Sequence, residues 1–237
     1  MNVIMRTTIT PAVLIVGIVL AGAASAQHQD VDIEVVGGQL VTVGGIYTTG
    51  SFVGRVFEGE MIPGSTVNET HEPGFEAAAG TFSEGDKVRY DFVQQLLYWN
   101  GTALASTSAG LTVSFGSSSQ TITAADSAGL PGFLVGTADE FGGFHRDLDF
   151  SLPTTAEDGL YGIVLKLSPE LGTSGFTTSE PFLIAFLNGE VANFNDGIAA
   201  MVNVALVPEP SSVVLAGLGA AVLAAGAWRR RRAAGKV

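Results

Sequence analysis

Three histidines, each close to acidic residues, are the side chains of this chain best suited to binding chemistry. They are the only histidines among its 237 residues. Together with nearby acids they give six candidate metal ligands: His28, Asp30, His71, His145, Asp147 and Asp149. Imidazole combined with carboxylate suits zinc and other first-row metals, whereas a set of oxygen ligands alone would suit calcium. We therefore predict a divalent metal site in which zinc is favoured over calcium.

Two of these clusters share the pattern His-x-Asp-x-Asp, at residues 28–32 and 145–149. On a β-strand this spacing would place all three side chains on one face, about 7 Å apart at each step. Neighbours that far apart do not hold one ion by themselves, so each cluster would supply one or two ligands. His71, in a loop with Pro73 and Gly74, is the expected third contributor. A plain surface role for each histidine is the alternative, because a histidine beside an acid is common on exposed strands of acid-rich chains.

The elements that must position these residues are mostly β-strands. Residues 28–35 alternate polar and apolar side chains, which is the period-two pattern of a half-buried strand. Further short strands are expected near residues 39–43, 52–57, 87–97, 111–115, 120–123, 144–152, 159–167 and 182–187. Asn100 and Gly101 suit a type I′ hairpin turn, and residues 193–204 suit one short helix. We predict a mainly β fold, a single β-sandwich or jelly-roll-like domain over residues 27–206.

The charge of this domain limits its partners. Six of the eleven basic residues of the chain lie near its ends, so the domain keeps five basic residues against all but one of the 23 acids. Such a surface repels nucleic acid and anionic lipid, and it attracts cations. The chain has no cysteine, so its stability must come from burial of a core, with help from a bound ion where one is present.

The N-terminus has the form of an export signal. Arg6 precedes an apolar stretch, and the small residues Ala24 and Ala26 flank Ser25 in the pattern that signal peptidase accepts. We therefore expect a signal peptide over residues 1–26, with a helical apolar part, and a mature chain that starts at Gln27.

The C-terminus has three parts, a Pro-Glu-Pro box, an apolar run and an arginine cluster. The residues that define the first and last parts are Pro208, Glu209, Pro210, Arg229, Arg230, Arg231 and Arg232. This order resembles the tail of PEP-CTERM proteins, which implies export and processing by the membrane transpeptidase exosortase. We expect a sorting tail over 207–237, with a transmembrane helix at 211–228 and its basic end, 229–232, on the cytoplasmic side. The apolar run is short for a permanent anchor, so the protein is expected at the cell envelope or extracellular surface, membrane-anchored at least transiently.

Segments of the domain also resemble a family of exported PEP-CTERM proteins of cyanobacteria and planctomycetes. The similar segments are 71–75, 97–101, 142–145 with 148–150, and 178–182 with 186–189. Some members of that family are repressed by a zinc-sensing regulator, and their histidine motifs fall on His28 with Asp30, on His71, and on His145 with Asp149. Where relatives carry a second histidine after His145, this chain has Asp147, which weakens the preference for zinc over calcium.

Three functions are compatible with these features. The first is a non-catalytic, exosortase-processed surface or matrix protein that binds a divalent metal, and this is the one we favour, so we do not expect an enzyme. The second is a module that binds extracellular polysaccharide. The third is a metal-dependent hydrolase, which would need an open coordination position and a nearby base.

Overall fold

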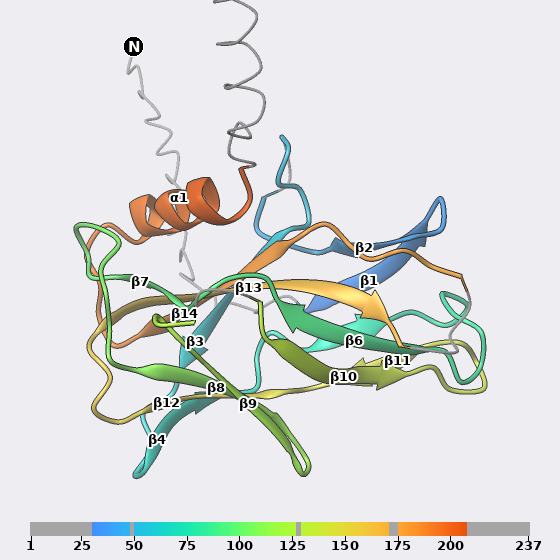
Figure 1. The fold of residues 1–237 in the computed structure, drawn as a ribbon, viewed down its shortest axis with the longest axis horizontal. Helices are drawn as coiled ribbons and strands as arrows, with labels where there is room; N and C mark the ends of the chain where they lie inside the picture. Colours follow the sequence, from blue (N-terminus) through green and yellow to red (C-terminus); the bar gives the residue numbers. More distant parts are fainter. Residues whose placement is uncertain (1–29, 48–49, 127–128, 171–174, 208–237) are drawn as a thin grey trace, which may run out of the picture.

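The computed structural model describes residues 30–47, 50–126, 129–170 and 175–207. In these residues the chain forms 14 β-strands and one α-helix (Figure 1). The predicted signal peptide and the predicted transmembrane helix lie outside this part of the chain. Within it, no helix is both long enough and apolar enough to cross a membrane.

The largest sheet, sheet B, runs through the middle of the domain. Its strands in spatial order are β10 (Pro131–Thr137), β6 (Lys87–Phe92), β13 (Gly159–Pro169), β14 (Phe182–Asn188) and β3 (Val56–Met61), and β7 (Leu97–Trp99) also pairs with β13. Seven consecutive residues of β13, from Gly159 to Leu165, are buried. A continuous apolar run of this kind is typical of a strand that is covered on both faces.

Two four-stranded sheets complete the β structure. Sheet A has the order β11 (Phe144–Arg146), β5 (Phe75–Ala77), β1 (Val31–Val36) and β2 (Gln39–Val43). Sheet C has the order β4 (Val67–Thr70), β12 (Asp149–Pro153), β8 (Gly110–Phe115) and β9 (Ser118–Thr123). The chain passes between these sheets twice, from β4 to β5 and from β11 to β12.

Sheets A and C both pack against the same face of sheet B. The ring of Phe75 on sheet A lies 6.4 Å from that of Phe182 on sheet B, and Phe150 on sheet C lies 4.7 Å from Phe186. Apolar residues of all three sheets form one buried cluster. Burial of this shared core is the main stabilising contribution to the fold.

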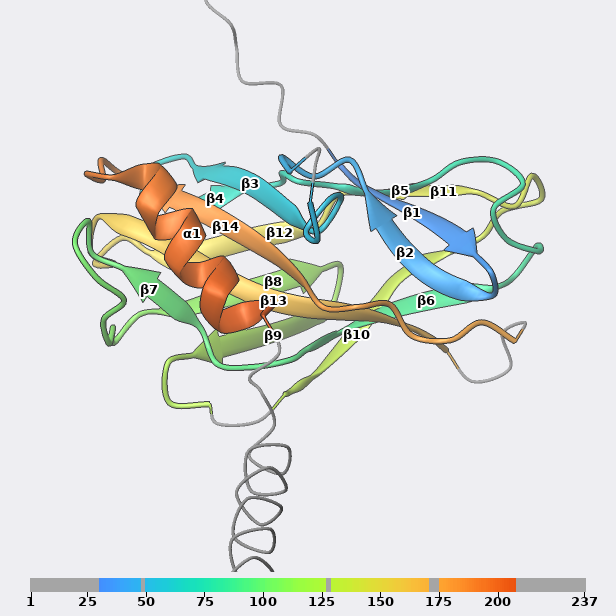
Figure 2. The same ribbon diagram turned by 90° about the horizontal axis from the view of Figure 1, so that it is seen from above.

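The other face of sheet B is covered by α1 (Phe194–Ala205), which lies across β13 and β14 (Figures 1 and 2). Ile198, Met201 and Val202 are buried there against Leu160 and Leu183 of the sheet. Spacings of three and four residues place these helix side chains on one stripe. The domain thus has two apolar cores, one on each face of sheet B.

The mainly β fold and the helix near residues 193–204 are confirmed. Strand β2 has the predicted bounds, but three other predictions need correction. The strand expected at 52–57 begins only at Val56, the stretch 87–97 is broken after Phe92, and the stretch 144–152 is broken between Arg146 and Asp149. Strands β4, β5, β7 and β10 were not predicted, since three of them have only three or four residues and β10 begins with Pro131 and Gly132.

The predicted type I′ turn at Asn100 and Gly101 is wrong. Gly101 has a φ of 91°, but Asn100 is not among the described residues with positive φ. The side-chain oxygen Oδ1 of Asn100 instead accepts hydrogen bonds from the backbone N–H groups of Thr102 and Ala103. The predicted hairpin itself is confirmed, because Trp99 pairs with Leu104 in an antiparallel bridge across this turn, and only the turn type differs.

Candidate functional site

One imidazole contacts two carboxylates at the edge of sheet A. The Nε2 atom of His145 lies 3.3 Å from Oδ2 of Asp30 and 3.2 Å from Oδ1 of Asp147. These three side chains, which we call the His145 cluster, come from β11, from the residue before β1 and from the link between β11 and β12. They are partly exposed, with 55% of the His145 side chain accessible to solvent.

The backbone around Gly74 holds this cluster together. Strand β5 lies between β1 and β11, pairing in parallel with β1 and antiparallel with β11. Just before β5, the N–H of Gly74 donates to Oδ1 of Asp30 over 2.9 Å, and the carbonyl of Gly74 accepts from Val31 N–H over 2.8 Å. A Cβ atom at position 74 would lie 2.7 Å from Oδ1 of Asp147 and 3.0 Å from Oδ1 of Asp30. The two carboxylates therefore approach each other in space that only glycine leaves free.

His71 belongs to a different ion pair. Its Nδ1 atom lies 2.7 Å from Oδ1 of Asp149, the first residue of β12, and both side chains are largely exposed. The structure thus gives His71 and His145 separate carboxylate partners. His28 lies outside the described residues, so a site shared by all three histidines stays a prediction.

The His145 cluster continues into an acidic face of sheet A. His145 is paired in register with Glu76, and Glu76 is paired with Asp32, so these side chains form one row across β11, β5 and β1. Glu34 follows Asp32 on the same face of β1, because side chains two apart in a strand point the same way. The apolar residues between them point into the core.

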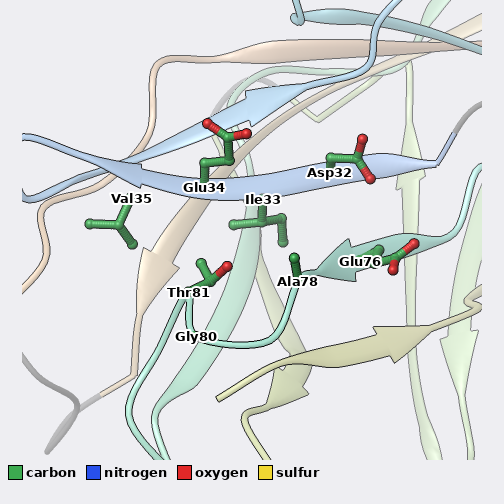
Figure 3. Close-up of a pocket in the computed structure, with 8 residues that line it drawn as sticks. All are labelled: Asp32, Ile33, Glu34, Val35, Glu76, Ala78, Gly80 and Thr81. Atoms are coloured by element: carbon green, nitrogen blue, oxygen red, sulfur yellow. The ribbon is translucent and has the colours of Figure 1, made fainter. Parts of the chain in front are cut away.

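A cavity of about 490 Å³ lies beside this row. Its lining residues are Asp32, Ile33, Glu34, Val35, Glu76, Ala78, Gly80 and Thr81. Strand β5 pairs with β1 only as far as Asp32, and the chain then turns away through residues 78–81. Figure 3 shows Ile33 and Val35 pointing toward this turn, with Asp32 and Glu34 on the opposite side of β1. The cavity therefore lies beside the part of β1 that follows Asp32, where β5 no longer pairs with it.

The acids of this face repel one another. Burial raises the pKa of Asp32 above its ordinary value, and the negative charges of Glu76, Asp30 and Glu34 raise it further. Both causes disfavour the ionised carboxylate. A cation bound at this face would relieve the repulsion.

The predicted strand geometry of the two His-x-Asp-x-Asp motifs is wrong. Strand β1 begins at Val31, after Asp30, and β11 ends at Arg146, before Asp147. The break after Arg146 lets Asp147 turn back onto His145, which residues two apart on one straight strand cannot do. Sequence reasoning also missed Gly74, Glu76 and the cavity. The alternation of Phe75, Glu76 and Ala77 was the one available signal, over only three residues.

The residue types of the His145 cluster suit a divalent metal, but their arrangement does not form a metal site. Among the described residues, no group of three or more His, Cys, Asp or Glu side chains is arranged to hold a metal ion as it stands. Two ligands on an ion with bonds near 2.1 Å lie roughly 3.0–3.4 Å apart. The separations of 3.2 and 3.3 Å in the His145 cluster fall in that range. To bind an ion, the carboxylates would have to turn toward it.

The adjacent aromatic residues Tyr98 and Trp99, which could stack on a sugar only if they were exposed, are buried. Tyr98 and Trp99 have 4% and 7% of their surface exposed, and Tyr98 donates a hydrogen bond to the carbonyl of Asp158. Both rings pack within the domain, against Tyr161 in the case of Tyr98. They do not form a platform on the surface.

Comparison with known proteins identifies the C-terminal segment. Residues 206–232 match the PEP-CTERM protein-sorting motif. No curated protein has significant similarity to the chain. The chain therefore carries the tail of an exported protein that is sorted to the cell envelope and processed by exosortase. The predicted sorting residues from Pro208 to Arg232 fall within this match. All of the predicted sorting residues, Ala24, Ala26, Pro208, Glu209, Pro210, Arg229, Arg230, Arg231 and Arg232, lie outside the described residues.

Proposed function

We propose that this is a non-catalytic protein of the cell envelope or extracellular matrix whose β domain binds a divalent metal. The metal ligands are Asp30, His145 and Asp147. One observation carries the proposal: two carboxylates from distant parts of the chain converge on a single nitrogen of an exposed imidazole. Exposed ion pairs of this kind contribute little to stability, about 0–1 kcal/mol, so stability alone is a weak reason for the convergence.

The surrounding charge supports binding of a cation. Asp32, Glu34 and Glu76 add three carboxylates beside the His145 cluster, and the pKa of Asp32 is raised first by burial and then by the negative charges of its neighbours. An ion with two positive charges lowers this repulsion when it binds. The acidic face therefore favours a divalent cation over an anion or a neutral ligand.

The donor set favours zinc. One imidazole nitrogen and two carboxylate oxygens suit zinc, whereas calcium prefers six to eight oxygen ligands. Of the other predicted ligands, His28 precedes Asp30 by two residues and is a candidate for a further ligand. His71 and Asp149 form their own pair and are not part of this proposed set.

The proposed location follows from the sorting tail. The predicted transmembrane helix at 211–228 anchors the protein in the membrane at least until exosortase acts, and the basic residues that follow hold the end of the chain on the cytoplasmic side. The partners are signal peptidase, exosortase and the bilayer. We expect no partnership with nucleic acid, because the domain is strongly acidic.

The test is a measurement of bound zinc in four forms of the full chain. The four forms are wild type, His145→Ala, Asp147→Asn and His71→Ala. Each is purified in detergent, loaded with zinc and dialysed to remove unbound zinc. The metal that remains is measured by mass spectrometry. Wild type and His71→Ala are expected to keep one zinc per chain, and the other two variants to lose it. His71→Ala is the matched control, because it removes an exposed imidazole with a single carboxylate partner.

The outcomes separate the alternatives. Absence of bound zinc from the wild type would overturn the proposal. Equal loss in His71→Ala and His145→Ala would instead support the wider site of the sequence prediction. Circular dichroism of each variant shows whether the β fold is retained.

A further inference from the structure

Apolar side chains are exposed around the point where the domain meets its sorting tail. Ile46 and Val53, between β2 and β3, are 45% and 49% exposed, and Val204 and Val207, at the end of α1, are 53% and 41% exposed. These four make up almost half of the large hydrophobic residues that are exposed in the described part of the chain. We call them the tail-proximal surface.

The two segments that carry this surface lie over the same face of sheet B. Helix α1 covers β13 and β14, and the segment from β2 enters β3, which pairs with β14. Tyr47 and Phe52 pack against the apolar cluster that contains Met201 and Leu206 of the helix end. Figure 1 shows α1 and the connection from β2 to β3 on one side of the domain, with β4 and β9 on the other.

Acidic residues are scarce along these two segments. No Asp or Glu occurs from Val35 to Phe57, and Asp196 is the only one from Val191 to Val207. The rest of the domain is strongly acidic. The exposed face of α1 after Asp196 consists of Ala199, Asn203 and Val204, none of which is charged. Beside the other segment, the exposed carboxylate of Glu180 is offset by Arg55, 3.9 Å away.

We propose that the tail-proximal surface rests on the phospholipid bilayer while the tail anchors the chain. This inference depends on the membrane anchoring proposed above. Five residues lie between Val207 and Val213, where the apolar run of the tail begins, so the two positions are at most about 21 Å apart along the chain. The tail therefore keeps the end of α1 close to the hydrocarbon core of the bilayer. Apolar side chains at that position can enter the interfacial layer.

Docking of this surface would set the distance between the Pro-Glu-Pro box and the membrane. Pro208, Glu209 and Pro210 directly follow Val207. With Val204 and Val207 at the interface, the box lies at the membrane surface, where a membrane transpeptidase acts. A neutral, apolar contact also lets a strongly acidic domain lie close to a membrane that contains anionic lipid.

The test uses the absence of natural cysteine. Single cysteines at Val53, Val204, Ile62 and Phe141 are labelled with a fluorophore in the full chain, which is then reconstituted in vesicles of phosphatidylethanolamine and phosphatidylglycerol. Ile62 and Phe141 are matched controls, since they are 65% and 68% exposed but lie in the connections from β3 to β4 and from β10 to β11. A fifth label at Leu218 reports whether the tail is inserted.

Quenching by lipids that carry a nitroxide is expected to be at least about threefold stronger at Val53 and Val204 than at the two controls. Adding Val53→Asp should reduce lipid quenching at Val204, whereas Ile62→Asp should not. Quenching at Leu218 with no difference between the other sites would overturn the docking but keep the anchor. A water-exposed label at Leu218 would overturn both. Chelation of metal should leave all the labels unchanged, which separates this test from that of the metal site.

Discussion

The substitution Gly74→Ala tests the His145 cluster without removing any of its polar groups. The new Cβ would lie 2.7 Å from Oδ1 of Asp147 and 3.0 Å from Oδ1 of Asp30. Contacts under 3.0 Å cannot persist, so the carboxylates must turn away from position 74. Because these atoms are the ends of partly exposed side chains, they can move without disturbing the core.

The expected effects on stability nearly cancel. Gly74 does not have positive φ, and replacing glycine by alanine at such a position stabilises by about 0.4–1 kcal/mol through the unfolded chain. Displacing Asp30 weakens its hydrogen bond from Gly74 N–H, whose net contribution is about 1 kcal/mol at a partly exposed position. The free energy of unfolding should therefore change by no more than about 1 kcal/mol. Zinc affinity should fall about 10- to 100-fold, as for other changes that misplace metal ligands.

Gly175→Ala is the matched control. A Cβ at position 175 would have no heavy atom within 4 Å, and its φ is not positive. This variant should gain stability by about 0.4–1 kcal/mol and bind zinc like the wild type. Urea denaturation gives the stabilities and titration calorimetry the affinities. Wild-type zinc affinity in Gly74→Ala, with the fold intact, would refute the assignment of Asp30 and Asp147 as ligands.

Three further predictions concern stability. Met201→Ala should lower the free energy of unfolding by about 2–5 kcal/mol, because Met201 is fully buried between α1 and sheet B; a loss below 1 kcal/mol in urea denaturation would contradict this packing. Asp32→Asn should raise the melting temperature at pH 7 and not at pH 3, because burial and neighbouring carboxylates raise the pKa of Asp32, so that its ionised form disfavours the folded state. Burial raises the pKa of Tyr161 to about 12 from an ordinary value of 10.0; the neutral phenol therefore favours folding below pH 10, and this contribution is lost as pH rises toward 12. Urea denaturation should show a lower free energy of unfolding at pH 12 than at pH 9. The difference should be smaller in Tyr161→Phe. Ionisation of Tyr161 at pH 10 in the folded protein would contradict this prediction.

The sequence predicted the parts of the fold that have a strong local pattern. The apolar run of β13 and the helix near Met201 are examples, because burial on both faces of a strand and on one stripe of a helix leaves a clear periodicity. Short strands such as β5 have too few residues to show a period. The break after Arg146 depends on β11 and β12 joining different sheets, which is a tertiary property that no local pattern carries.

The candidate site was predicted in composition but not in geometry. Histidine beside aspartate pointed to Asp30, His145 and Asp147, and these do meet. The sequence placed each motif on one strand, whereas the contacts run between β1 and β11 with β5 in the middle. A contact between Asp30 and His145, which are brought together only through β5, cannot be read from the spacing of residues within one motif. The sorting tail was predicted well, because its three parts are adjacent in sequence.

The pairing of β3 with β14 has a consequence for how an exported chain can fold. These strands are parallel neighbours, with Val56 opposite Leu183 and Met61 opposite Asn188, although most of the domain separates them in sequence. An exported chain crosses the membrane with its N-terminus first, so β3 emerges long before its partner. Sheet B therefore stays incomplete until nearly the whole domain has crossed, and contacts of such long range form slowly. Because β14 ends at Asn188, not far before the sorting motif begins at residue 206, the sheet can close only when the sorting tail is near the membrane.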